Sequence, residues 1–161
     1  MDNKLPIYGD IVFNAKPDAV PYNYRISYKV SQLCLIMHIC GRGNSCSLIK
    51  LHMISFALLS QQNMDKLIDF SERIDESVIV RFDPAVNRAL TYSVAYGFIS
   101  QQPNGNYRLT KQGQNLAERI KLAEDLMTNE IRLLTALSKK LTETRIKELI
   151  DIWRDRHAED Q

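Results

Sequence analysis

Residues 97–113, GFISQQPNGNYRLTKQG, constrain the fold most, because they read as two short strands joined by a tight turn. Asn104 and Gly105 both tolerate positive φ, which predicts a type I′ turn between strands at 98–102 and 106–110. Gly97 is suited to end a preceding helix, and Thr110 is suited to cap the next one. A hairpin between two helices is typical of the wing of a winged-helix domain.

Helical patterns dominate the chain before this hairpin. Residues 27–40 are apolar almost all round, which is typical of a central helix. After the break GRGN, Ser45 or Ser47 is expected to cap a second helix, and a third is expected at about 64–73. SVIVRF at 77–82 has the composition of a strand, and Asp83 followed by Pro84 predicts the start of a helix.

The two ends of the chain extend this unit. After the hairpin, one helix is expected to about residue 127, followed by two amphipathic helices. Their apolar stripes need burial, by folding back, by dimerisation or by a partner segment. Residues 1–24 contain three prolines and predict an extended arm with a short strand at 10–14. We therefore expect a mainly α fold (α+β), with a winged helix-turn-helix domain at 25–127, an N-terminal arm at 1–24 and a C-terminal helical extension at 128–161.

The sequence contains no recognisable pattern for catalysis or metal binding. GRGN lacks the context of a phosphate-binding loop, and no nucleophile elbow or paired carboxylates occur. The spacing of Cys34, Cys40 and Cys46 with His38 and His52 forms no C-x-x-C knuckle. From these observations together we expect no metal or other cofactor and no enzyme. No apolar run reaches the ~18 residues of a membrane span. We therefore expect no membrane contact, and the odd number of apparently buried thiols favours a cytoplasmic protein.

Positive charge is concentrated in the middle of the chain, where residues 25–60 and 84–113 contain no acid. The candidate nucleic-acid contacts are Lys50, Arg88, Arg108 and Lys111. Specific DNA binding usually uses about 6–10 phosphate contacts, more than this set offers per copy. The sequence therefore favours at most weak, non-specific contact with DNA.

One stripe of the helix that begins at Pro84 has the chemistry of a protein interface. Arg88, Tyr92 and Tyr96 follow one another at four-residue spacing, whereas Val86, Leu90 and Val94 are the expected core positions. Exposed Tyr beside Arg is favoured at protein interfaces, although the tyrosines could instead cover the hairpin. The candidate interface residues are Arg81, Asn87, Arg88, Tyr92, Tyr96 and Trp153.

Three segments together resemble a known family: YRISYKVSQLCLIMHICGRGNSCSLIKLHMISFALLS, RFDPAVNRALTYSVAYGFIS and NGNYRLTKQGQNLAERI. They resemble the middle components of bacterial ABC three-component systems, which include the small subunit of Lamassu-type anti-phage complexes. The resemblance covers about residues 24–120, and its most specific feature is the order of GRGN, KLH, RFDP and NRAL.

The resemblance implies a non-catalytic accessory subunit that docks on an SMC-like coiled-coil ATPase. Such a subunit helps couple the sensing of foreign DNA to an effector nuclease, while ATP, Mg²⁺ and nuclease chemistry belong to the partners. RFDPAVNRA is the stretch expected to face a neighbouring subunit. The alternative is a dimeric winged-helix transcriptional regulator, and a third hypothesis is an enzyme or metal protein of another class.

Overall fold

A computed structural model describes residues 25–160. The arm predicted at residues 1–24, with its strand at 10–14, lies outside the described residues. The elements in chain order are α1 (Ile26–Cys40), β1 (Ser45–Cys46), α2 (Leu48–Ala57), α3 (Gln61–Ser71), α4 (Pro84–Ala95), β2 (Ile99–Gln101), β3 (Tyr107–Leu109), α5 (Lys111–Leu122), α6 (Thr128–Leu137) and α7 (Glu143–Glu159). The fold is mainly helical with a small antiparallel sheet, as the sequence predicted.

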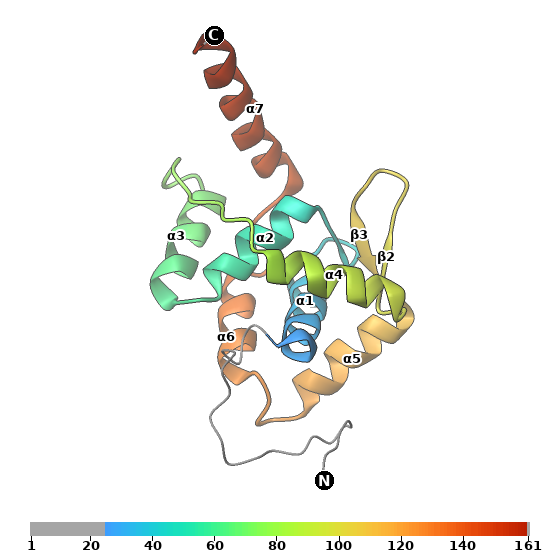
Figure 1. Cartoon of the computed structure of the whole chain (residues 1–161). Coiled ribbons are helices and arrows are strands. Elements are labelled where there is room, and N and C mark those ends of the chain that lie inside the picture. Colours follow the sequence, from blue (N-terminus) through green and yellow to red (C-terminus); the bar gives the residue numbers. More distant parts are fainter. Residues whose placement is uncertain (1–24, 161) are drawn as a thin grey trace.

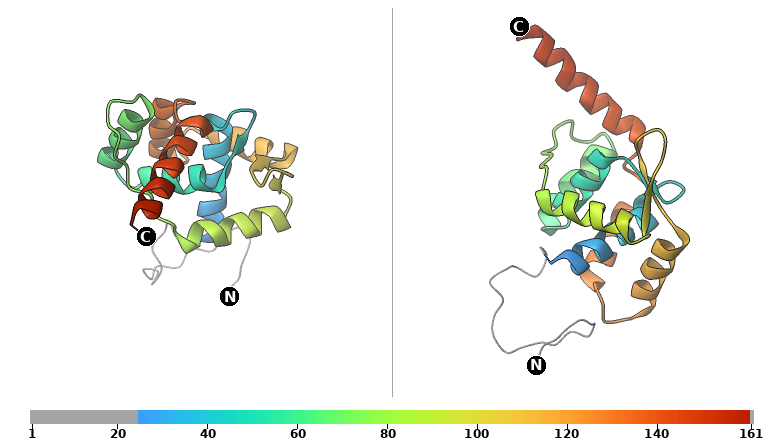
Figure 2. Two further views of the ribbon diagram at one scale, coloured as in Figure 1. Left: turned by 90° about the horizontal axis from the view of Figure 1, so that it is seen from above. Right: turned by 45° about the vertical axis from the view of Figure 1, so that its right-hand side comes forward.

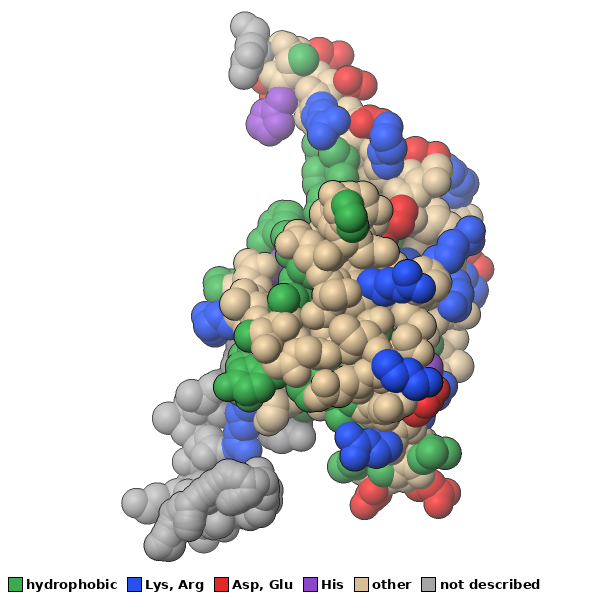
Figure 3. Space-filling model, turned by 90° about the vertical axis from the view of Figure 1, so that its right-hand side faces the viewer, with side chains coloured by type: hydrophobic (Ala, Val, Ile, Leu, Met, Phe, Trp, Pro, Cys, Tyr) green, Lys and Arg blue, Asp and Glu red, His purple; other side chains and the backbone are tan. Residues whose placement is uncertain are grey.

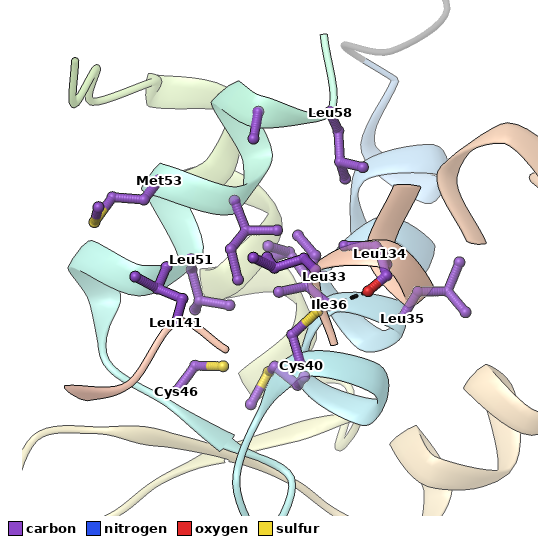
Figure 4. Packing of buried hydrophobic residues seen from close by; sticks show 14 of the residues in the cluster. Leu33, Leu35, Ile36, Cys40, Cys46, Leu51, Met53, Leu58, Leu134 and Leu141 are labelled. Atoms are coloured by element: carbon purple, nitrogen blue, oxygen red, sulfur yellow. Dashed lines mark hydrogen bonds between the residues drawn. The ribbon is translucent and has the colours of Figure 1, made fainter. Parts of the chain in front are cut away.

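Helix α1 lies at the centre, because its sequence is apolar on nearly every side. It packs against α2, α4, α5 and α6, which surround it in Figures 1 and 2. Its residues Leu33, Leu35 and Ile36 are completely buried, and Figure 4 shows them among side chains from α2 and α6. The Cys40 thiol also donates to the Leu134 carbonyl of α6 at 3.5 Å.

The sheet has the order β1-β3-β2, with both pairs antiparallel. Strand β1 was not predicted, because its two residues become a strand only by pairing with Tyr107 and Arg108. The chain reaches this pairing through a turn in which Gly43 and Asn44 both have positive φ, 60° and 61°. That combination is what a type I′ turn requires.

The predicted type I′ turn at Asn104-Gly105 is wrong. Only Gly105 has positive φ, at 90°, and its N–H donates to the Gln102 carbonyl at 2.9 Å. Pro103 is the second residue of this turn, a position that favours a type I turn followed by glycine. The hairpin itself is confirmed, and Ile99 pairs with Leu109 at its base.

The strand predicted at 77–82 is also wrong. These residues form no regular element and pair with no strand among the described residues. Val78 and Val80 are partly buried against the core, while Ile79 between them is exposed. The strand-like alternation therefore reflects an extended segment that lies on the helices without reaching a sheet edge.

The C-terminal helices fold back on the same core, the first of the three possibilities left open by the sequence. Leu133, Leu134 and Leu137 of α6 are buried. Leu141 is also buried but follows the end of α6, after Ser138 with its φ of 52°.

Helix α7 begins on the core and then projects away from it (Figures 1 and 2). Its buried Arg145 donates to the Phe70 carbonyl at 2.9 Å and pairs with Glu76 at 3.0 Å. The guanidinium also lies 4.0 Å from the centroid of the Phe70 ring. Among the described helices, none is long and apolar enough to cross a membrane.

Candidate protein-interaction surface

Helix α4 begins where the sequence predicted, at the Asp83-Pro84 pair. The Asp83 carboxylate accepts a hydrogen bond from the Ala85 N–H at 2.9 Å, and Pro84 occupies the first helical position. Asp satisfies one free N–H of the first turn, and Pro has no N–H to leave unpaired. Local sequence chemistry therefore sets the start of the helix that carries most of the candidate interface residues.

A buried polar network holds this helix start against α1. Lys29 of α1 donates to Gln32 at 3.1 Å and to the Ser55 hydroxyl at 3.0 Å, and its ammonium lies 3.9 Å from the Asp83 carboxylate. Burial lowers the pKa of Lys29, and the charge of Asp83 opposes that shift. One feature of the sequence indicates such a network, since Lys29 interrupts a helix that is apolar almost all round.

His52 of α2 connects the same helix start to α2. The backbone N–H of Asp83 donates to Nδ1 of His52 at 3.1 Å, so Nδ1 is unprotonated. Nε2 then carries the proton and donates to the Asn87 side-chain oxygen at 3.2 Å. Burial lowers the pKa of His52, which favours this neutral form, while the Asn87 hydrogen bond opposes the shift. Asn87 therefore serves the fold with its oxygen and offers only its amide nitrogen outward.

The outward face of α4 is nearly free of charge. Tyr92 and Tyr96 are 38% and 61% exposed, and their rings stack with centroids 4.2 Å apart. Val94 was predicted to be a core residue, but it is 41% exposed. The inward positions are Val86, Leu90 and the small residues Ala89 and Ser93, because the helical period of 3.6 turns position 94 outward. We define the α4 surface as the exposed residues Asn87, Arg88, Thr91, Tyr92, Val94, Ala95 and Tyr96.

A groove continues the α4 surface toward the hairpin. It has a volume of about 570 Å³, lies between α4 and strands β2 and β3, and has no charged side chain in its lining. Val94, Gln101 and Tyr107 contribute to its walls. On the face of the molecule in Figure 3, exposed hydrophobic side chains gather along one margin, whereas most Lys and Arg lie toward the other. The groove and the α4 surface together form an area with a single charge, Arg88, which is suited to protein contact.

The remaining candidate interface residues lie on other elements. Arg81 is exposed just before α4, and its guanidinium lies 5.5 Å from the centroid of the Phe56 ring. The exposed Phe82 beside it packs on the His52 ring with centroids 4.9 Å apart. Trp153 is half-buried on α7 and packs against the core there, so it is not part of the α4 surface. Sequence reasoning did not identify Phe82, although it lies within the RFDP motif.

The four candidate nucleic-acid contacts do not all lie on the open surface. Arg88, Arg108 and Lys111 are exposed on α4, β3 and α5. Lys50 is only 3% exposed and lines a pocket on another part of the molecule. Its side chain is therefore not on the open surface where it could meet a duplex alongside the other three.

The three thiols have low reactivity in this fold. Burial raises the pKa of Cys34, Cys40 and Cys46 to about 12, so they stay protonated at neutral pH and are weak nucleophiles. Within residues 25–160, no three His, Cys, Asp or Glu side chains come together in a way that could hold a metal ion.

Comparisons of this chain with protein-family models, with curated proteins and with solved structures found no match.

Proposed function

We propose that this protein is a non-catalytic winged-helix subunit that binds a protein partner through the α4 surface. The observation that carries the proposal is the stacked, exposed pair Tyr92 and Tyr96 on a helix face with a single charge, Arg88. Large rigid rings bury much area at low entropic cost, and Tyr and Arg are frequent binding hot spots. The pair stabilises the folded core little, because both rings face outward.

The order of elements supports the winged-helix part of the proposal. A three-stranded sheet of order β1-β3-β2 has β1 after the first helix and a hairpin after α4. In a winged helix, the helix before the hairpin is the one that reads DNA. Here α4 has that position, with α3 as an additional helix before it.

The charge of α4 favours a protein over DNA as its partner. A DNA-reading helix needs cations for phosphates and polar groups for base edges. The α4 surface offers one cation, and the Asn87 oxygen is already engaged by His52. Arg108 and Lys111 nearby in sequence leave room for weak, non-specific contact only.

The family resemblance supplies the class of partner. We infer that the partner is an SMC-like coiled-coil ATPase of a bacterial anti-phage or anti-plasmid complex, which also contains an effector nuclease. In this arrangement the protein acts as a cytoplasmic scaffold, and ATP hydrolysis and DNA cleavage take place on the other subunits.

The test is co-purification with the coiled-coil ATPase expected to be encoded beside this protein. The double variant Tyr92→Ala, Tyr96→Ala should weaken the complex by about 30-fold or more, the effect of losing one hot-spot residue of ~2 kcal/mol. The matched control is Leu122→Ala with Leu126→Ala, which removes two exposed apolar side chains from another part of the surface.

The control should leave the complex intact. The free energy of unfolding of both variants should lie within about 1 kcal/mol of that of the parent protein. Unchanged co-purification of the tyrosine variant would refute the α4 surface as the binding site. Absence of a neighbouring ATPase gene would refute the partner. Salt-sensitive binding of a dimer to its own promoter would favour the regulator instead.

A further inference from the structure

A second site lies away from α4, in a pocket of about 450 Å³ beside the start of α7. We define the Lys50 pocket by its charged lining residues Arg42, Lys50, Lys139 and Glu143, together with Thr144. Cys40 and Leu141 form part of its apolar side, and both belong to the core shown in Figure 4. Three cations and one acid line the pocket, so its net charge is positive.

Lys50 is the unusual member of this set. The residue is 3% exposed, yet its ammonium makes no hydrogen bond or ion pair with any described residue. Its Nζ is not among the fully buried polar atoms, so the ammonium is the part of the residue that reaches the pocket. The other buried lysine, Lys29, donates to Gln32 and Ser55 and lies near Asp83. Lys50 therefore holds its donors toward the pocket without a protein acceptor.

The start of α7 adds further donors. The Thr142 hydroxyl accepts from the Arg145 N–H at 3.0 Å and so caps one free amide. The N–H groups of Glu143 and Thr144 make no hydrogen bond to the described residues. Free amides and the positive end of the helix dipole attract anions at such a position. The helix has 17 residues, long enough for its dipole to develop.

The remaining charges are compatible with an anion. Lys139 donates to the Gly41 carbonyl at 3.2 Å, which leaves other N–H groups of its ammonium free. The Glu143 carboxylate accepts from the Ser47 N–H at 2.9 Å, so its charge is engaged by the start of α2. Arg42 is exposed at the pocket.

We propose that the Lys50 pocket binds a phosphoryl group, with Lys50 and the first amides of α7 as donors to its oxygens. Lys139 and Arg42 add positive charge at the same site. The source of the phosphate is either a free phosphorylated small molecule or the terminal phosphate of a nucleic-acid strand. Internal phosphates of a duplex fit less well, because Lys50 lies inside a pocket and only 3% of the residue is exposed. This inference does not depend on the partner proposed for the α4 surface.

The test titrates the full-length, ¹⁵N-labelled protein with inorganic phosphate, with chloride used to keep the ionic strength constant. The amide signals of Lys50, Glu143 and Thr144 should shift together and saturate. Lys50→Met keeps the apolar stem and should weaken phosphate binding about tenfold or more, as expected for a lost hydrogen bond to a charged group. Lys147→Met is the matched control, since Lys147 is an exposed lysine on α7. It should bind phosphate within about twofold of the parent protein.

The source is identified by two further titrations, one with a nucleoside monophosphate and one with a short strand carrying a 5′-phosphate. Tighter binding of the nucleotide than of phosphate supports a small ligand, and tighter binding of the phosphorylated strand than of its unphosphorylated form supports a nucleic-acid end. Absence of saturable shifts up to about 10 mM phosphate would overturn the proposal, because a millimolar site would then be mostly filled. Equal affinity of the Lys50→Met variant would overturn it as well.

Discussion

Replacing Asp83 tests how α4 is held in place. Its carboxylate caps the helix through the Ala85 N–H at 2.9 Å and lies 3.9 Å from the ammonium of the buried Lys29. Asp83→Ala removes both interactions. Asp83→Asn keeps a capping oxygen and removes only the charge, because Asn and Asp cap helices equally well. The two variants therefore separate the cap from the ion pair.

The expected costs follow from these contacts. Loss of a helix cap costs about 1 kcal/mol. In burial, the ion pair of Asp83 with Lys29 is intermediate between two classes. Exposed pairs contribute up to about 1 kcal/mol, and breaking a buried pair costs about 3–5 kcal/mol. The Asp83 side chain is 31% exposed, and Lys29 keeps its hydrogen bonds to Gln32 and Ser55. A cost of about 1–2 kcal/mol is then reasonable for the charge, giving about 2–3 kcal/mol for Asp83→Ala and about 1–2 kcal/mol for Asp83→Asn.

The assay is urea unfolding followed by circular dichroism, with the free energy of unfolding taken from linear extrapolation. The slope with urea should stay constant across the three proteins, so that midpoint shifts report stability alone. If the free energies of unfolding of Asp83→Ala and the parent protein agree within about 0.5 kcal/mol, the network does not hold α4. If both variants lose the same free energy, the cap contributes nothing.

Two further predictions concern the packing around α4 and the hairpin. Burial lowers the pKa of His52 below its usual 6.5, so the unfolded chain takes up a proton first and stability should fall as the pH drops through 6.5. His52→Gln should reduce this loss in urea unfolding between about pH 7.5 and 5.5, and His38, whose pKa burial also lowers, accounts for the part that remains. Gly113→Ala should destabilise the protein by about 3 kcal/mol or more in thermal unfolding, because the new Cβ would lie 2.1 Å from the Phe98 carbonyl oxygen. Gln112→Ala on the exposed side of α5 is its control, and equal melting temperatures for the two would contradict the predicted clash.

The sequence predicted one helix stripe of the candidate interface, but it did not predict the placement of Phe82 and Trp153. The four-residue spacing of Arg88, Tyr92 and Tyr96 predicts one helix stripe, and all three are exposed together on α4. No spacing relates Trp153 on α7 to that stripe, and the structure leaves it on a separate element. Phe82 packs on His52, which bonds to Asn87 of α4, and no helical spacing predicts that contact.

The sequence by itself determined where most helices begin. Ser47, Asp83, Thr110 and Thr142 each accept a hydrogen bond from an amide two or three residues ahead. These interactions are local, so a few neighbouring residues suffice to specify them. The apolar pattern of α1 likewise predicted a central helix, because a helix without a polar face must be surrounded.

Only the tertiary structure decided the features that need a distant partner. Ser45 and Cys46 become a strand because β3, some sixty residues later, supplies the hydrogen bonds, whereas residues 77–82 find no sheet edge and stay irregular. The two buried lysines differ for the same reason. Lys29 lies near Ser55 of α2 and Asp83 before α4, and Lys50 makes no hydrogen bond in the pocket that it lines. The local sequence determines the charge of a residue and the periodicity of the element it lies on. The environment of that residue depends on which remote segments pack around it.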